Sequence, residues 1–294
     1  MLRALRSEVY RLRRRWMPWI ILGLIVLLGF VFYELIYFTL NSQLQLMRSG
    51  NIPANAAPGG TQAAIAQAEE TLQQITPKHI AGFGVSLVAG VGSVMLIVFA
   101  ASQMGTDYGW GTLRTLLAAG VSRPSFLITK LGSIALFAVL FTILGVIATV
   151  IASFLVSSQA GFDTGGFDAG AVAVAGLKTA YCFLPYLALA ALIALWSRSS
   201  GAGIAAGLVI YFAESIVMQL LISFNKDYAT IANLGISRNV QSLSRAAVNV
   251  TAGPASGAPA LPDQTQAALV LAVWTIAFVA VAFWRLRVRD VTLA

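Results

Sequence analysis

The stretch LGSIALFAVLFTILGVIATVIASFLVSS, residues 131–158, contains no charged side chain and decides the fold class. An α-helix needs about 20 apolar residues to cross the hydrocarbon core of a bilayer. Lipid offers the backbone no hydrogen-bond partner, so an uninterrupted run of this length predicts a helix, whereas a barrel strand would alternate over about 10 residues. This stretch is therefore predicted to be a membrane-spanning helix.

Five further apolar runs extend this interpretation to the whole chain. Of the 294 residues, 58% are hydrophobic and 10% are charged; soluble domains have about 25% charged residues. The six predicted spans are residues 16–40, 81–103, 131–158, 171–196, 199–224 and 266–284. The sequence thus predicts an all-α, polytopic membrane protein with six transmembrane helices in a single domain, residues 1–294.

The basic residues are distributed unevenly around these spans. The net charge is +8, and most of the 19 lysines and arginines precede the first span, separate the second from the third, or follow the fourth and the last. Basic residues gather on the cytoplasmic side of membrane proteins, which predicts a multi-pass protein of the plasma (inner) membrane with both termini cytoplasmic. Attraction to anionic lipid accounts for the charge without nucleic acid.

The N-terminal segment, residues 1–16, has a basic amphipathic pattern. Leu5, Val9, Leu12 and Trp16 follow one another at helical spacing, and arginines occupy most of the other faces. This pattern predicts a helix that lies in the membrane interface. The alternative is a cluster of charges that sets the topology and contacts no partner.

The segment between the second and third spans, residues 104–130, reads MGTDYGWGTLRTLLAAGVSRPSFLITK. A short helix is predicted over residues 112–119, with Gly120 placed to end it. A second helix is predicted to start near Ser122, whose side chain is suited to an N-cap. A helix that is too short to cross and is apolar on one side must lie against lipid or against another protein.

This segment resembles the one that follows the second helix in ABC-2 type transporter permeases. The pattern is Asp107, Gly111-Thr112-Leu113-Arg114, Leu116-Leu117, Gly120-Val121-Ser122-Arg123 and Lys130. The N-terminal SEVYRLRRRW, the six spans, the long stretch before the last span and the basic ending WRLRVRD are similar to the same family. The resemblance therefore covers essentially the whole chain. The sequence departs from the family where Asp107 replaces a frequent glutamate and where Ala118-Ala119 replaces frequent basic residues.

The resemblance implies the transmembrane subunit of an exporter that a separate ATPase subunit drives. It implies that residues 104–124 form a coupling segment that docks on the ATPase, beside the N-terminal interfacial helix. The implied coupling residues are Asp107, Gly111, Thr112, Leu113, Arg114, Leu116, Leu117, Ser122 and Arg123. The implied partners are the ATPase with its ATP and Mg²⁺ and a second copy of the permease or a similar permease. An amphipathic drug, peptide or lipid-like cargo is expected.

Other motifs add no chemistry of the chain's own. It has no G-x-x-x-x-G-K-[ST] phosphate loop, so ATP hydrolysis is expected from a partner and the chain is not expected to be an enzyme. The glycine-rich GAGIAAG, residues 201–207, lies inside an apolar run and is predicted to allow close helix packing. His79 and Cys182 lack metal-ligand spacing, so no metal and no cofactor are predicted.

Two acids fall within predicted spans. An ionisable side chain in lipid is costly, which makes Glu34 and Glu214 candidates for the translocation path. The alternative for Glu34 is solvation near the headgroups. For Glu214 the alternative is a structural hydrogen bond to Tyr211 or to a serine on a neighbouring helix.

The stretch before the last span, residues 225–265, is predicted to be extracytoplasmic. Its first half is expected to form a re-entrant or interfacial helix pair, and its second half, which includes TAGPASGAPALPD, a flexible tether.

Two other functions remain open at this point. One is a proton-coupled secondary carrier or channel that uses Glu214 or Glu34, although the chain lacks the internal repeat common in carriers. The other is a sensory or assembly protein that binds a partner through the short helix and moves nothing.

Overall fold

The computed structural model describes residues 2–49, 61–109, 111–162, 164–225, 228–247 and 261–288. Helices dominate these residues, and none of them lies in a β-strand. Six helices are long and apolar enough to cross a membrane, as predicted: α2 (Trp16–Arg48), α4 (Phe83–Gly109), α6 (Arg123–Ala160), α7 (Ala169–Ser197), α8 (Ser200–Phe224) and α11 (Gln264–Val288). Several extend beyond the apolar runs, because the helical hydrogen bonds continue into the polar flanks. The chain is a multi-pass helical membrane protein.

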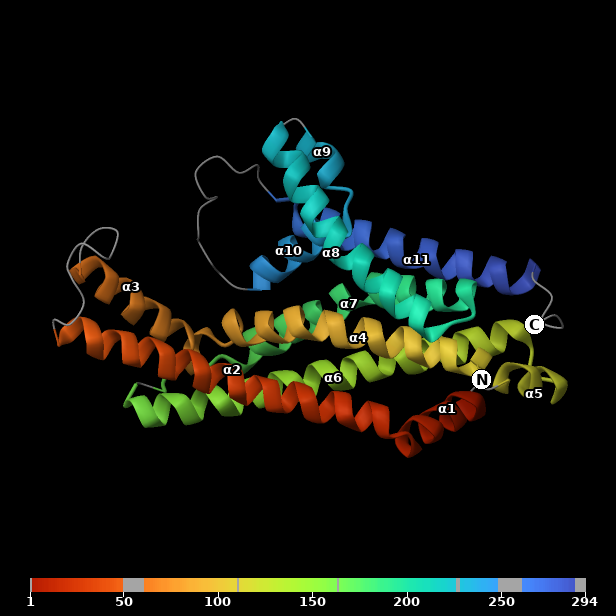
Figure 1. Cartoon of the computed structure of the whole chain (residues 1–294), viewed down its shortest axis with the longest axis horizontal. Coiled ribbons are helices and arrows are strands. Elements are labelled where there is room, and N and C mark those ends of the chain that lie inside the picture. Colours follow the sequence, from red (N-terminus) through yellow and green to blue (C-terminus); the bar gives the residue numbers. More distant parts are fainter. Residues whose placement is uncertain are drawn as a thin grey trace.

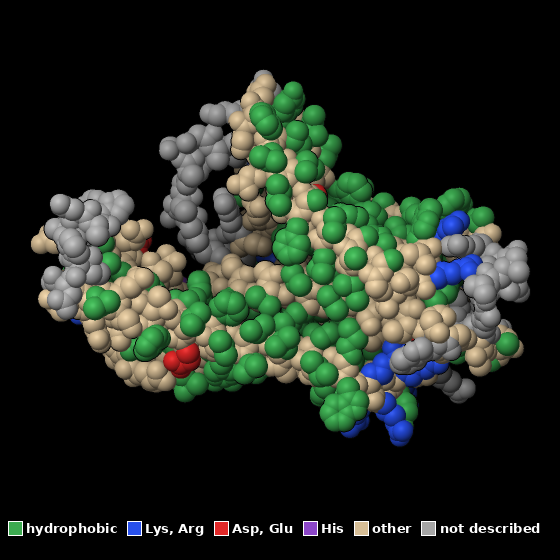
Figure 2. Space-filling view, viewed as in Figure 1, with side chains coloured by type: hydrophobic (Ala, Val, Ile, Leu, Met, Phe, Trp, Pro, Cys, Tyr) green, Lys and Arg blue, Asp and Glu red, His purple; other side chains and the backbone are tan. Residues whose placement is uncertain are grey.

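Shorter helices precede, connect or flank these six. They are α1 (Leu2–Arg14), α3 (Thr61–Gln74), the 3₁₀ turn η2 (Pro77–His79), α5 (Thr112–Ala118), α9 (Ala229–Ala232) and α10 (Ile236–Ala247). In Figure 1, α1, α5 and the C-terminal end of α11 lie at one end of the bundle and α3 lies at the other. The end with α1 and α5 carries most of the blue side chains in Figure 2, so it is called the basic end below.

The link between α1 and α2 is a single extended residue. Arg15 has φ −88° and ψ 139°, which interrupts the helical hydrogen bonds. Pro18 then falls in the first turn of α2, where the missing N–H costs little. The chain can therefore change direction between α1 and α2, and Figure 1 shows the bend.

The centre of the bundle is formed by α4 and α7, which pack on each other and on α6 and α8. Small residues bring the backbones of α4, α7 and α8 close together. A Cβ atom at Gly203 would lie 2.6 Å from the Cβ of Ala194, and one at Gly105 would lie 2.3 Å from the backbone nitrogen of Ser200. The predicted role of the stretch 201–207 in close packing is confirmed.

The substitution Gly203→Ala is expected to destabilise the fold, because the added methyl group overlaps Ala194. Overpacking of this kind costs about 1–3 kcal/mol. Gly90→Ala is the matched control, since it lies in α4 and a Cβ there meets nothing within 4 Å. Thermal unfolding in detergent should show a lower midpoint for Gly203→Ala and an unchanged or higher midpoint for Gly90→Ala. Equal midpoints would contradict the packing.

Candidate functional site

A buried ion pair joins the two helices that flank α5. Asp107 lies in the last turn of α4, and Lys130 lies two turns after the start of α6. Lys130 Nζ is 2.5 Å from Asp107 Oδ2, and the side chains are 1% and 0% exposed. The pair therefore closes the base of the segment that contains α5.

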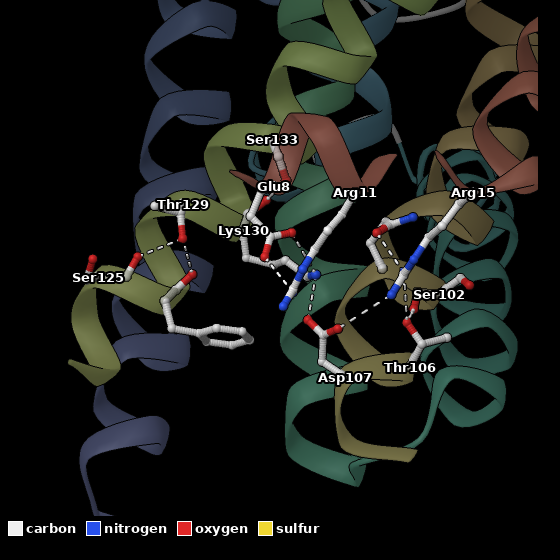
Figure 3. Close-up of polar contacts among 12 residues, drawn as sticks. Glu8, Arg11, Arg15, Ser102, Thr106, Asp107, Ser125, Thr129, Lys130 and Ser133 are labelled. Carbon is white, nitrogen blue, oxygen red and sulfur yellow. Dashed lines mark hydrogen bonds and ion pairs between the residues drawn. The ribbon is translucent and has the colours of Figure 1, made fainter. Parts of the chain in front are cut away.

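The N-terminal helix contributes a second acid to the same ammonium group. Glu8 of α1 is buried, and its Oε2 lies 3.3 Å from Lys130 Nζ. Figure 3 shows Glu8 and Asp107 directed at Lys130 from different helices. One buried lysine thus connects α1, α4 and α6.

Two arginines complete the network. Arg11 Nη1 lies 3.0 Å from Glu8 Oε1, within α1. Arg15, the extended residue after α1, places Nη2 3.8 Å from Asp107 Oδ1. Its Nη1 donates hydrogen bonds to the side-chain oxygens of Gln103 at 3.2 Å and Thr106 at 3.3 Å, both on α4. Arg15 therefore fixes the bend between α1 and α2 to the end of α4.

The energetics make each buried charge depend on its partners. Removing one member of a buried ion pair costs about 3–5 kcal/mol, because the remaining charge is left in a medium that solvates it poorly. Asp107 is especially dependent: among the described residues its oxygens have ion-pair contacts but no hydrogen bond of suitable geometry. The attraction of Lys130 and Arg15 therefore holds it in place.

The network also divides into two pairs. Glu8 and Arg11 belong to α1 and move together, whereas Asp107 and Lys130 belong to the bundle. A movement of α1 away from α6 would break the Glu8–Lys130 contact, yet each of these four charges would keep at least one partner. The arrangement thus permits a hinged α1 without an isolated buried charge.

The turn at the end of α5 is built as the sequence predicts. Gly120 has φ +85°, the left-handed conformation that glycine adopts without strain, and the N–H of Val121 donates to the carbonyl of Leu116 at 3.1 Å. These are features of a Schellman C-cap. Ser122 then caps α6 by accepting a hydrogen bond from the backbone nitrogen of Ser125 at 3.4 Å. The predicted roles of Gly120 and Ser122 are confirmed.

The remaining predicted coupling residues lie in different settings. Gly111 has φ +67° and precedes the half-buried Thr112, the first residue of α5. Leu116 packs against the hydrophobic core. The side chains of Leu113, Arg114 and Leu117 lie outside the described residues.

Arg123 reaches across to the last spanning helix. Its Nη1 donates to the carbonyl oxygens of Leu286 and Arg287, each at 3.2 Å. These are carbonyls at the C-terminal end of α11, which a cation stabilises. Arg123 therefore ties the start of α6 to α11.

The predicted interfacial stripe on α1 is divided between two environments. Leu12 is buried in the core cluster, whereas Val9 and Trp16 are exposed, and the side chain of Leu5 lies outside the described residues. The helix itself is observed; its position in the membrane interface stays a prediction.

Sequence reasoning missed the roles of Glu8, Arg11 and Arg15 and noted Lys130 only as part of a motif. A signal was present, since Glu8 is the one acid among residues 1–16. A lone acid on an arginine-rich helix indicates a specific cationic partner or a solvated surface position, and the sequence alone does not separate these.

The two intramembrane acids differ. Glu214 of α8 accepts hydrogen bonds from the backbone nitrogen of Ser237, 3.0 Å from both carboxylate oxygens, and from the hydroxyl of Tyr186 at 3.2 Å. Ser237 is at the N-terminal end of α10, so Glu214 anchors that helix. Glu34 is exposed and accepts a hydrogen bond from Gln159 at 3.4 Å.

The stretch 225–265 contains the two helices expected of its first half, α9 and α10. Residues 248–260, which hold most of the predicted tether, lie outside the described residues. Among the residues that are described, no group of three His, Cys, Asp or Glu side chains could hold a metal ion.

Fold and site together define the class as a polytopic helical membrane protein with a buried ionic network at its basic end. A family model described as a protein of unknown function (DUF2705) matches residues 67–292. The match covers more than half of the chain, so the chain belongs to the DUF2705 family. A comparison with curated proteins found no match. The matched region includes Asp107 and Lys130, whereas Glu8 and the rest of α1 precede it.

Lys130→Met is expected to be strongly destabilising, by about 3–5 kcal/mol, because it leaves the Asp107 carboxylate without its closest partner. Glu8→Gln should cost less, since Lys130 keeps Asp107. Arg48→Gln is the control: its pair with Glu69 is exposed, and such pairs contribute about 0–1 kcal/mol. The measurement is the unfolding midpoint in detergent. A Lys130→Met protein as stable as Arg48→Gln would show that the buried pair is not needed.

Glu214→Leu is expected to loosen α10, because the N–H of Ser237 loses its acceptor. Hydrogen–deuterium exchange of the peptide around residues 236–243 should become faster, and exchange in α6 should not change. Glu34→Leu is the control, since Glu34 contacts Gln159 and no residue of α10. Unchanged exchange in α10 would contradict an anchoring role.

Proposed function

We propose that this chain is the transmembrane permease subunit of an ATP-driven ABC exporter. It would act with a separate ATPase subunit, which binds ATP and Mg²⁺, and with a second copy of itself or a similar permease. The support from sequence is the resemblance of residues 104–130, of the N-terminal segment and of the C-terminal ending to ABC-2 type permeases.

The observation that carries the proposal is the buried Asp107–Lys130 pair at the base of the α5 segment. A segment that transmits movement from an ATPase to spanning helices must be attached to them rigidly, because a flexible attachment would absorb the movement. The pair joins α4 to α6 on the two sides of α5, and Glu8 adds α1 to the same point. Movement of α5 would therefore be transmitted to three helices at once.

The proposed mechanism uses this connection between α5 and the spanning helices. ATP would close the ATPase subunits on each other and draw the α5 segments of the two permeases together. The spanning helices would then reorient and release cargo on the opposite side of the membrane. ATP drives such a change only if it binds the closed ATPase better than the open one. The basic end would face the cytoplasm of a cell whose plasma (inner) membrane holds the protein.

The coupling residues would have two different roles in this proposal, because Asp107 is buried and cannot touch the ATPase. Leu113, Arg114 and Leu117 would contact the ATPase. Asp107 would fix the base of the segment through its ion pair with Lys130. An amphipathic drug, peptide or lipid-like cargo suits spanning helices with few charges. Glu214 would act on the cargo path through α10, the helix that it anchors, while Glu34 would lie at the path's outer edge.

The decisive experiment is an affinity purification of the full chain from native membranes in mild detergent. Wild type is compared with Leu113→Glu/Arg114→Glu and with a control, Gln67→Glu/Gln74→Glu, which adds negative charge on exposed positions of α3 at the opposite end. We expect an ATPase, identified by mass and by ATP hydrolysis, with wild type and control and not with the α5 variant.

An outcome in which no sample brings an ATPase, although the chain stays folded and oligomeric, would remove the exporter proposal. Proton-coupled flux through reconstituted vesicles, with Glu214→Gln as the variant, would then be measured to test the carrier alternative.

Glu8→Gln is expected to separate binding from coupling. The variant keeps α5 unchanged, so the ATPase should co-purify at the wild-type level. Stimulation of ATP hydrolysis by a hydrophobic compound should fall roughly 5-fold or more, the lower end of coupling between distant sites. Thr115→Ala, an exposed position of α5, is the control. Full stimulation with Glu8→Gln would show that α1 takes no part in coupling.

A further inference from the structure

The helix α1 has one face that is buried against the bundle and one that is exposed. Toward the bundle, Glu8 and Leu12 are buried, and Arg11 is paired with Glu8. Away from the bundle, α1 exposes Arg6, Tyr10, Arg13 and Arg14. This second surface, together with Trp16 and Trp19 at the start of α2, is called the outer face of α1.

The outer face carries positive charge that no acidic side chain among the described residues neutralises. The nearby acids are already used, because Glu8 pairs with Lys130 and Arg11 while Asp107 pairs with Lys130 and Arg15. In the part of the chain that the structure describes, Arg6, Arg13 and Arg14 form no ion pair. Figure 2 shows blue side chains projecting from the molecule at this end. A partner of the outer face must therefore be anionic.

The aromatic side chains indicate where that partner lies. Trp16 is 83% exposed and Trp19 is 56% exposed. The Nε1 of Trp19 donates to the carbonyl of Arg13 at 2.9 Å, which holds the ring beside the end of α1, and Arg14 lies 5.0 Å from the ring centre of Tyr10. Exposed tryptophans at the start of a spanning helix are typical of the headgroup region of a bilayer.

We propose that the outer face of α1 binds anionic phospholipid headgroups, and that bound lipid keeps α1 docked on α6. Beyond the extended residue Arg15, α1 is held on the bundle side by the Glu8–Lys130 contact and by the buried Leu12. Lipid on the other side would hold α1 in the plane where Glu8 meets Lys130. The charge of the surrounding lipid then sets how much of the protein has α1 docked, whatever the protein transports.

A lipid surface fits better than an acidic partner protein. Both would satisfy Arg6, Arg13 and Arg14. A folded protein surface would have to cover Trp16 and Trp19 as well, although these begin a helix that is long and apolar enough to cross a bilayer. An anionic headgroup layer satisfies the charges and the aromatic rings together.

The test is hydrogen–deuterium exchange of α1 in the full-length chain, reconstituted in nanodiscs of phosphatidylcholine with or without phosphatidylglycerol. We expect slower exchange of α1 as the phosphatidylglycerol fraction rises, reversed by high salt because ions screen exposed charges. Each arginine near the membrane surface contributes about fivefold to the preference for anionic lipid. The variant Arg6→Gln/Arg13→Gln/Arg14→Gln should therefore lose the dependence on phosphatidylglycerol.

Two controls sharpen the result. Arg6→Lys/Arg13→Lys/Arg14→Lys keeps the charge and should keep the dependence, and Arg48→Gln removes an exposed arginine at the opposite end and should change nothing in α1. Exchange in α4 reports whether each variant is folded. If the glutamine variant fails to fold, the comparison of lipids with wild type still decides.

Three results would overturn the proposal. One is equal exchange of α1 with and without phosphatidylglycerol. Another is protection by free inorganic phosphate in phosphatidylcholine discs, which would indicate a site for a soluble anion. The third is protection in the same discs only after a partner protein binds, which would assign the outer face to that protein. None of these readouts requires an ATPase, so the exporter proposal stands or falls separately.

Discussion

The structure of the basic end depends on one buried ammonium group. Lys130 is 1% exposed and lies within 3.3 Å of two carboxylates that come from α1 and α4. A lysine in such a place is stable as a cation only when oxygens replace its water, and each carboxylate in turn needs the cation. The three helices must therefore meet at this point. The contact also determines where the short helix α5 lies, because α5 is connected to the two helices that the Asp107–Lys130 pair joins.

The rest of the bundle follows from the demands of lipid. Backbone groups must bond internally, so the spans are helices, and their association relies on close packing. Gly203 and Gly207 of α8 face Ala194, Ala190 and Ile97, and side chains larger than hydrogen would separate these helices. The polar network and the small-residue contacts are thus complementary. Packing holds the centre, and charge orients the end where α1 and α5 attach.

The spans were predictable because their signal is local. In lipid, the backbone of a long apolar run can satisfy its hydrogen bonds only as a helix. The residue types of Gly120 and Ser122 alone indicated the C-cap of α5 and the N-cap of α6. The ionic network was not predictable, because Glu8, Asp107 and Lys130 are far apart in sequence and no pattern couples them. Glu214 illustrates a further limit. The alternative of a hydrogen bond to a serine on a neighbouring helix is met by Ser237 of α10, but the donor is its backbone nitrogen, and the tyrosine that bonds Glu214 is Tyr186 and not Tyr211. A backbone donor on another element has no sequence signature.

The length of the acidic side chain at position 107 has a physical meaning in this chain. An aspartate is one methylene shorter than a glutamate, so its carboxylate stays close to α4 and the lysine must reach toward it. Lys130 does so, and its amino group ends between Asp107 and Glu8. A longer acid at position 107 would extend further across the gap and compete with Glu8 for the same ammonium. The shorter acid therefore leaves room for α1 in the network, which makes the docking of α1 and the choice of aspartate parts of a single arrangement.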